Sequence, residues 1–448
     1  MSISNRKEAL VLFVGDVTLL IAALWLTLLV RYAELPDATL FVGHIVPFGI
    51  LFLVWVVNFF IAGLYEKHTL LLKSRLPNIL LNTQIINSVI AVLFFYFIPY
   101  FVIAPKTNLF IYLVISSVLI LGWRIFGVPA FGFRKKQKAI LIGSGEEMRE
   151  LRDEVNGNPR YSLVFFSSVD LSELSGIDFE EEVLNTIYSE SISTVVIDLK
   201  DERAEPILPR LYNLIFSGVR FVDKYKVYED IFDRIPLSLV GYNWFLENIS
   251  SASHMGYDAL KRIMDIAVGI TIGAVSLIVY PFAYIAIKLD DGGPVFFRAE
   301  RVGRNNRAIY LIKFRSMGTT SAGGGIEAAP RITRVGAFLR NTRLDELPQL
   351  WNVLRGDISL VGPRPETPAL VKLYEKEIPY YSIRSLIKPG LSGWAQIYHQ
   401  EHPHHGVAVS ETKVKLSYDL YYIKNRSFLL DLKIALKTIK TFLSRVGK

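Results

Sequence analysis

Four apolar runs in the first third of the chain constrain the fold more than any other feature. Each run is close to the ~20 residues that a helix needs to cross a bilayer. The chain as a whole is 51% hydrophobic, with a mean hydropathy of +0.33, which is too apolar for a wholly soluble protein. We therefore expect a four-helix transmembrane bundle within residues 1–135. The runs lie at approximately Ala9–Val30, Phe41–Gly63, Ile79–Ile103 and Leu109–Gly127.

The distribution of basic residues around these runs predicts their orientation. The positive-inside rule places short loops rich in Lys and Arg on the cytoplasmic side. The amino terminus and everything after residue 134 should therefore be cytoplasmic. Within the first run, Asp16 should pair with another polar group near the interface, and we assign it no catalytic role. The basic residues on the cytoplasmic side are Arg6, Lys7, Lys67, Lys73, Arg75, Arg134, Lys135, Lys136 and Lys138, whereas the opposite loops hold Arg31 and Lys106.

Residues 136–255 are predicted to form a small Rossmann-like, doubly wound domain followed by a linker. Short apolar segments alternate there with polar helical patterns, which is typical of a parallel sheet covered by helices. The expected strands begin with Ala139–Ile142 and continue near Leu163–Val169, Thr194–Leu199 and Val219–Val222.

The first turn of this domain resembles a dinucleotide-binding turn only in part. Gly143 and Gly145 fit the motif, but Met148 occupies the third glycine position. No clear ribose-binding acid ends the next strand. We expect a degenerate domain with a structural or regulatory role rather than a working nicotinamide site.

A fifth apolar segment, Ile263–Ile287, is long enough to span a membrane but carries positive charge on both flanks. Lys261 and Arg262 precede it and several basic residues follow it, which favours both ends on the same side. Pro281 removes a helix hydrogen bond and crowds the preceding turn. The pattern predicts a re-entrant helix. The alternative is a kinked fifth span, which would place residues 288–448 outside the cytoplasm.

Asp345 and Glu346 are the most informative neighbours in the last third of the chain. Pro348 suits the first turn of a helix, and Leu347 before it should be pushed away from helical angles. We therefore expect both carboxylates at the mouth of a helix, whose free N–H groups attract anions. Adjacent side chains point in different directions, so that one carboxylate could attack phosphorus while the other holds a metal. The alternative is an acidic turn that only complements the helix dipole.

Basic residues in the same region favour phosphate chemistry. The alternation from Tyr310 to Arg315 predicts a strand with Lys313 and Arg315 on one face, and two prolines restrict the backbone around Arg364. With Arg340 and the two carboxylates, these residues predict a site for a diphosphate and a divalent metal. The net charge of +8 suits anionic lipid headgroups or phosphorylated substrates. The chain has no Cys, which excludes disulfides and thiolate catalysis, and it has no nucleic-acid-binding motif.

With these residues in view, the last third closely resembles the bacterial sugar transferase family, the monotopic phosphoglycosyl transferases. The preceding spans and α/β domain resemble the large members of that family, found in capsule, exopolysaccharide and O-antigen assembly. The resemblance implies a mixed α/β monotopic catalytic domain over residues 256–448, with a re-entrant membrane helix at about 263–287 that breaks near Pro281. Tyr280 departs from the serine that small members commonly have before this proline. The matching stretches are Lys261-Arg262-x-x-Asp265, Gly293–Phe296, Lys313–Met317, Leu344–Asn352, Arg355–Pro365 and Lys388–Gln396.

The resemblance also implies covalent transfer of a sugar 1-phosphate. Asp345 would attack the sugar-bearing phosphorus of a nucleotide sugar such as a UDP-hexose, UMP would leave, and undecaprenyl phosphate would take the phosphosugar. Glu346 would bind Mg²⁺. The implied location is the bacterial inner membrane, in contact with its lipids, with the catalytic domain on the cytoplasmic face. The expected phosphate-binding cations are Lys313, Arg315, Arg340 and Arg364.

A second hypothesis is a non-enzymatic membrane scaffold or nucleotide-sensing regulator of polysaccharide synthesis, in which residues 138–235 bind the regulatory ligand. The sugar and the glycan pathway cannot be read from the sequence. The additional spans and the α/β domain offer surfaces on which a homo-oligomer could form.

Overall fold

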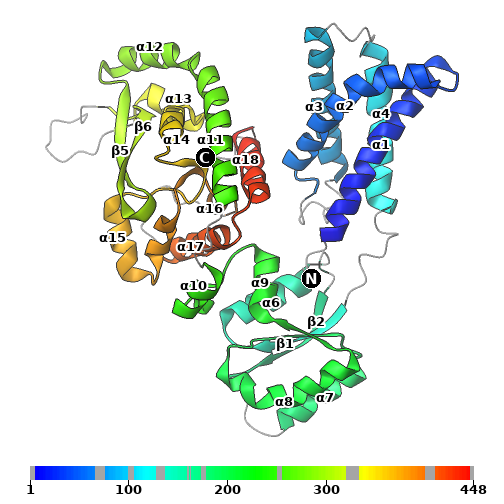
Figure 1. The fold of residues 1–448 in the computed structure, drawn as a ribbon, viewed down its shortest axis with the longest axis vertical. Coiled ribbons are helices and arrows are strands. Elements are labelled where there is room, and N and C mark those ends of the chain that lie inside the picture. Colours follow the sequence, from blue (N-terminus) through cyan, green and yellow to red (C-terminus); the bar gives the residue numbers. More distant parts are fainter. Residues whose placement is uncertain are drawn as a thin grey trace. The chain divides into compact units, whose positions relative to one another are not determined.

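The structure is a computed structural model that describes residues 6–65, 76–98, 105–127, 137–158, 161, 163–172, 178–249, 255–318, 332–398 and 409–443. The chain divides into two compact units, residues 1–232 and 233–448. Figure 1 shows the course of the chain through both units, which are described in turn.

The amino-terminal helices confirm the predicted membrane bundle. Four helices of the described chain before residue 128 are long and apolar enough to cross a membrane. Their core is aromatic, with the rings of Trp55 and Tyr112 5.1 Å apart, while large apolar side chains such as Leu53 face outward. The helices are α1 (Arg6–Tyr32), α2 (Ala38–Ile61), α3 (Leu76–Phe97) and α4 (Pro105–Gly122), which continues into a π-helical turn, η1 (Trp123–Gly127).

Asp16 pairs with Arg124 inside this bundle, as the sequence predicted for a polar partner. Both side chains are fully buried, and Arg124 also donates a hydrogen bond to the Leu64 carbonyl at 2.7 Å. An unpaired charge in an apolar bundle is expensive, so the guanidinium serves as counter-ion and links α1, the end of α2 and η1. The pair explains how the first run tolerates an aspartate.

The second part of the amino-terminal unit is a parallel four-stranded sheet in the order β2-β1-β3-β4. Helices α6 and α9 pack on one face and helices α7 and α8 on the other, each over its own apolar cluster. This arrangement confirms the doubly wound, Rossmann-like prediction. The elements are β1 (Gln137–Gly143), α6 (Glu146–Gly157), β2 (Leu163–Asp170), α7 (Asp178–Ser189), β3 (Thr194–Ile197), η2 (Glu202–Ile207), α8 (Leu208–Asn213), η3 (Leu214–Ser217), β4 (Arg220–Asp223) and α9 (Lys224–Phe232).

The carboxyl edge of this sheet differs from the sequence prediction in one respect. An acid does end the second strand, because β2 extends to Asp170, whose carboxylate accepts hydrogen bonds from the backbone and side chain of Ser172. Beside the glycine turn, Lys224 forms a buried 2.7 Å ion pair with Asp198. Met148, at the third glycine position, lies on α6 and its side chain is buried in the apolar cluster between this helix and the sheet.

The carboxy-terminal unit is a mixed α/β domain. Its strands form an antiparallel hairpin, β5 with β6, and a short parallel pair, β7 with β8. Residues before the predicted boundary at 256 belong to its core, because Trp244 packs in one cluster with Tyr374 and Leu420.

The elements of this unit follow in chain order. They are η4 (Leu237–Leu239), α10 (Tyr242–Asn248), α11 (Met255–Ser276), α12 (Val279–Asp291), β5 (Phe296–Val302), η5 (Arg304–Asn306), β6 (Ala308–Phe314), α13 (Arg334–Asn341), η6 (Leu344–Glu346), α14 (Gln349–Arg355), β7 (Ser359–Val361), α15 (Pro368–Glu377), η7 (Tyr381–Leu386), β8 (Gly390–Ser392), α16 (Trp394–Tyr398), α17 (Val409–Lys424) and α18 (Phe428–Leu443).

Helices α11 and α12 form a bent apolar pair, with an angle of 55° between them. The break falls at Leu277 and Ile278, four and three residues before Pro281. The position follows from the chemistry of proline, which lacks the N–H that would bond to the carbonyl of Leu277 and crowds that carbonyl. Figure 1 shows α12 turning away from the direction of α11 above the rest of the unit.

Several polar contacts fasten α11 to the rest of the unit, among them those of two adjacent basic residues. Arg262 donates to the carbonyls of Val353 and Leu354, both at 2.7 Å, near the end of α14. Lys261 forms a 2.8 Å ion pair with the buried Asp431 of α18. The contacts tie the amino-terminal half of the bent helix pair to the helix that follows Asp345 and Glu346.

The buried pair in the bundle generates a test. Asp16→Ala and Arg124→Met should each lower the thermal stability of the detergent-solubilised protein, because each leaves one buried charge unpaired, at about 3–5 kcal/mol. The double variant removes both charges and should be more stable than either single variant. Additive losses in the double variant, measured by thermal unfolding, would show that the two side chains do not depend on each other.

Candidate active site

Asp345 and Glu346 lie in a short 3₁₀ turn, η6, directly before α14. Arg343 begins the turn in the left-handed conformation, with φ at 58°, and Pro348 caps α14, as expected of a proline at a helix start. The prediction for Leu347 was wrong: its φ and ψ of −53° and −39° are helical. Its N–H closes the 3₁₀ turn onto the Leu344 carbonyl at 3.2 Å, and this bond outweighs the pre-proline preference.

Glu346 is held between two cations from distant parts of the sequence. Its Oε1 atom accepts hydrogen bonds from Lys313 Nζ at 2.8 Å and from Arg364 Nη2 at 3.0 Å. Burial by itself would raise the pKa of Glu346, but the charges of Arg364 and Lys313 outweigh burial and lower the pKa to about 2. Glu346 is therefore a carboxylate at any physiological pH.

Asp345 has a different environment. It is only 7% exposed, and its Oδ1 atom is buried without a hydrogen-bond partner in the part of the chain that the structure describes. Burial raises the pKa of Asp345, the negative charge of Glu346 raises it further, and nearby cations offset part of this shift. Two adjacent carboxylates thus have opposite pKa shifts, a pattern that separates roles in active sites.

The strand that carries Lys313 is tied to α14 by Asn352, which is fully buried. The Asn352 side chain donates to the Tyr310 carbonyl at 2.8 Å and accepts from the Ile312 N–H at 3.0 Å. A side-chain amide that bonds to one carbonyl and one N–H of a strand fixes the position of the helix along that strand. Lys313 on β6 and Glu346 before α14 are therefore held by one rigid frame.

The other predicted cations have different neighbours. Arg340, on α13, donates to the Ser316 hydroxyl at 2.8 Å. Arg315 lies just past β6, is 7% exposed, pairs with Asp291 and donates to the Met317 carbonyl at 2.9 Å. The structure brings Lys313 and Arg364 onto Glu346, while the bonds of Arg315 go to Asp291 and to backbone carbonyls.

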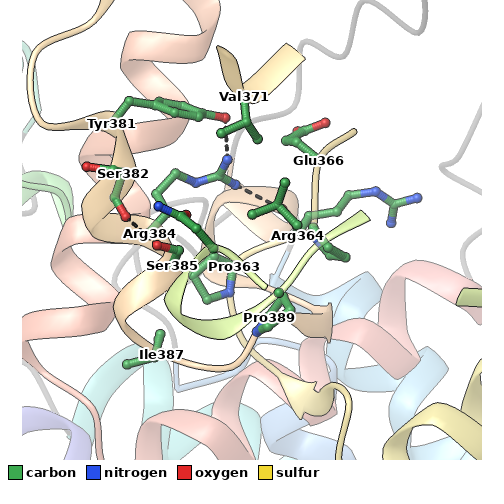
Figure 2. Close-up of a pocket in the computed structure, with 14 residues that line it drawn as sticks. Pro363, Arg364, Glu366, Val371, Tyr381, Ser382, Arg384, Ser385, Ile387 and Pro389 are labelled. Atoms are coloured by element: carbon green, nitrogen blue, oxygen red, sulfur yellow. Dashed lines mark hydrogen bonds between the residues drawn. The ribbon is translucent and has the colours of Figure 1, made fainter. Parts of the chain in front are cut away.

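The sequence analysis did not predict a second polar cluster, formed by Arg384 and Asp419, that contacts the backbone of Arg364. Arg384 and Asp419 form a 2.7 Å ion pair, and Arg384 also contacts the Tyr381 hydroxyl. These residues line or adjoin a pocket whose walls include Pro363, Arg364 and Glu366 (Figure 2). Arg384 and Asp419 are 35 residues apart in the sequence, so only the tertiary fold brings them together. The sequence feature nearest to Arg384 that could have pointed to it is the family-like stretch that begins at Lys388.

Mg²⁺ fits this group of residues. The ion is usually held by one or two carboxylates together with substrate phosphates rather than by a complete protein cage. The contacts of Glu346 among the described residues involve Oε1, which leaves Oε2 available to a metal. Within the described ranges, no group of three or more His, Cys, Asp or Glu side chains that could hold a metal ion is present.

Fold and site together define a class: a membrane protein whose carboxy-terminal α/β domain couples a bent apolar helix pair to a cation-flanked pair of carboxylates. The model of the bacterial sugar transferase family matches residues 256–445, which contain both features. In addition, a relative that this chain matches over 96% of the relative's length is 39% identical to it. The chain belongs to the bacterial sugar transferase family.

Three relatives show how far the similarity extends. The exopolysaccharide production protein PSS of Rhizobium leguminosarum bv. phaseoli is 39% identical over 194 residues, which cover 42% of this chain and 96% of the relative. The UDP-N-acetylgalactosamine-undecaprenyl-phosphate N-acetylgalactosaminephosphotransferase of Aeromonas hydrophila is 44% identical over 196 residues, 43% of this chain. The undecaprenyl-phosphate glucose phosphotransferase of Komagataeibacter xylinus is 31% identical over 336 residues, 71% of this chain. The matches span 45% of the Aeromonas protein and 61% of the Komagataeibacter protein.

The environment of Asp345 predicts the effect of neutralising it. Asp345→Asn should raise the thermal stability at pH 7 by about 1 kcal/mol, because a buried carboxylate with an unpartnered oxygen is costly. A raised folded-state pKa means that the wild-type protein gains stability as pH falls through that pKa, so the advantage of the variant should shrink in acid. A less stable variant at pH 7, or an advantage that grows in acid, would contradict the assignment.

Proposed function

We propose that this protein transfers a sugar 1-phosphate from a UDP-sugar to undecaprenyl phosphate, as the first membrane step in assembling a bacterial polysaccharide. The names of the Aeromonas and Komagataeibacter relatives describe phosphosugar transfer involving undecaprenyl phosphate. The observation that carries the proposal is the division of roles between the two carboxylates: Glu346 is neutralised by Lys313 and Arg364, whereas Asp345 has a free oxygen.

The reaction proceeds in two displacements at one phosphorus atom. A carboxylate oxygen of Asp345 attacks the sugar-bearing phosphorus, and the bond from that phosphorus to the bridging oxygen breaks. UMP leaves with the bonding electrons, which gives an aspartyl phosphosugar. A phosphate oxygen of undecaprenyl phosphate then attacks the same phosphorus and releases the Asp345 carboxylate. The product is undecaprenyl diphosphate sugar.

The surrounding residues neutralise charge on the transferring group. Lys313 and Arg364 supply two positive charges at Glu346, and the charge of Arg340 on α13 acts on Asp345, whose pKa it lowers in part. Electrostatic stabilisation of this kind is the main protein contribution to phosphoryl transfer. Mg²⁺, when bound by Glu346 with the free oxygen of Asp345 nearby, would screen the negative charge of the diphosphate.

The bent helix pair keeps this chemistry at the membrane surface. A soluble nucleotide sugar and a lipid phosphate meet only at the interface, so an anchor that enters and leaves by the cytoplasmic face places both within reach. The break at Leu277 and Ile278, and the fastening of α11 to α14 through Arg262, support a re-entrant pair in the inner membrane.

The assay that tests the proposal measures UMP release. Detergent-solubilised protein with undecaprenyl phosphate and Mg²⁺ should release UMP from at least one member of a panel of UDP-sugars. Asp345→Asn should lower the rate at least 1,000-fold, since loss of a nucleophile removes the chemical step (about 4 kcal/mol). Lys372→Met, an exposed charge on α15, is the matched control and should retain the wild-type rate.

Equal turnover by wild type and Asp345→Asn would refute the nucleophile. The absence of turnover with every sugar would refute the enzymatic proposal and favour a scaffold or sensor.

The re-entrant anchor makes a prediction about sidedness. Because the chain has no Cys, a single introduced Cys reports its own exposure. Asn243→Cys, before α11, and Lys372→Cys, after α12, are both at exposed positions. Both should react with a membrane-impermeant maleimide only after spheroplasts are permeabilised. Glu34→Cys, between α1 and α2, should react in intact spheroplasts and serves as the control for the opposite side.

Labelling of Lys372→Cys in intact spheroplasts, with Asn243→Cys protected, would show a fifth span and overturn the re-entrant assignment.

A further inference from the structure

Arg364 lies in a backbone segment that has few N–H groups with which to form hydrogen bonds. It lies between Pro363 and Pro365, which have no N–H to donate. The segment therefore offers fewer N–H donors than an ordinary chain, and its carbonyls provide several of its anchoring contacts. The carbonyl of Pro363 accepts from the Gly390 N–H at 2.9 Å, and that of Glu366 accepts from the Val302 N–H at 3.0 Å.

The carbonyl of Arg364 itself is held by a side chain. Arg384 Nη2 donates to it at 3.1 Å, while Arg384 Nε donates to Asp419 Oδ2 at 2.7 Å. The guanidinium thus spans from α17 to the Pro363–Pro365 segment, and it also donates a hydrogen bond to the Tyr381 hydroxyl. Figure 2 shows Arg384 between Tyr381 and this segment, with the side chain of Arg364 extending away from it.

The burial of the group favours one fixed geometry. Asp419 is 1% exposed and the Arg384 side chain 13% exposed, whereas the Arg364 side chain is 40% exposed. A planar guanidinium with three partners is rigid, because each hydrogen bond fixes the same plane. The buried pair therefore holds the backbone from which the more exposed Arg364 side chain reaches Glu346.

We propose that Arg384, oriented by Asp419, is a positioning residue that fixes the Arg364 backbone so that the Arg364 guanidinium meets Glu346 and the donor diphosphate. Arg384 contacts neither carboxylate of the site and acts only through Arg364. The inference rests on the proposed function for its kinetic readout. Arg384 and Asp419 were not among the site residues predicted from the sequence, so this role is additional to the proposed function.

The test is a double-mutant cycle between Arg384 and Arg364. Arg384→Gln in the full-length protein should lower kcat/KM for the UDP-sugar about 10-fold to 100-fold, the effect of losing a charged hydrogen bond. In an Arg364→Ala background the same change should have no further effect, because the group that it positions is gone. Arg384→Lys, which keeps the charge beside Asp419 but lacks the planar fork, should retain stability while losing most of this activity.

Two controls separate positioning from general destabilisation. Leu416→Ala removes a buried side chain from α17, the helix that carries Asp419, but leaves the polar contacts in place, so it should lower stability without lowering kcat/KM of the folded protein. Hydrogen exchange should increase over residues 361–367 in Arg384→Gln and remain as in wild type in Leu416→Ala. This measurement does not depend on turnover.

Additive losses from Arg364→Ala and Arg384→Gln, or unchanged exchange over residues 361–367, would overturn the positioning role. Absence of turnover by the wild-type protein would refute the proposed function and leave the exchange measurement to decide the positioning role.

Discussion

The rest of the site depends on the neutralisation of Glu346 by Lys313 and Arg364. Without these two cations, adjacent carboxylates in a partly buried turn would repel each other and favour protonation. The cations come from a hairpin strand and from a proline-rich segment, so the ion pairs require the whole α/β domain to be folded. Their electrostatic effect keeps Glu346 charged, and Asp345, whose Oδ1 atom has no hydrogen-bond partner among the described residues, is the member of the pair that we propose as the nucleophile.

The same domain joins this site to the bent apolar helix pair. Asn352 fastens α14 to the strand that carries Lys313, and the next two residues of α14 accept hydrogen bonds from Arg262 of α11 through their carbonyls. The bent helix pair and the carboxylates are consequently two ends of one connected frame. In the proposed reaction, whose two substrates differ in solubility, such a connection would set the height of the site above the bilayer by packing rather than by a flexible linker.

Local sequence rules predicted the elements better than the contacts. Apolar length predicted the four spans, and Pro281 predicted the bend, because bilayer thickness and the missing proline N–H act within a few residues. The pre-proline rule failed at Leu347, where the hydrogen bond that closes the 3₁₀ turn onto the Leu344 carbonyl outweighs the pre-proline preference. Strand alternation placed Lys313 and Arg315 on one face, but Arg315 lies past the end of β6 and pairs with Asp291. The contact between Arg384 and Asp419 depends on the packing of α17, which no local pattern encodes.

The most direct test of this account is to identify the residue that becomes covalently modified. Protein incubated with a UDP-sugar substrate and Mg²⁺, but without undecaprenyl phosphate, would be digested and its phosphosugar adduct located by peptide mass spectrometry. The account predicts an adduct on Asp345 that disappears when undecaprenyl phosphate is added. An adduct on Glu346 or on another residue, or transfer without any covalent adduct, would contradict it.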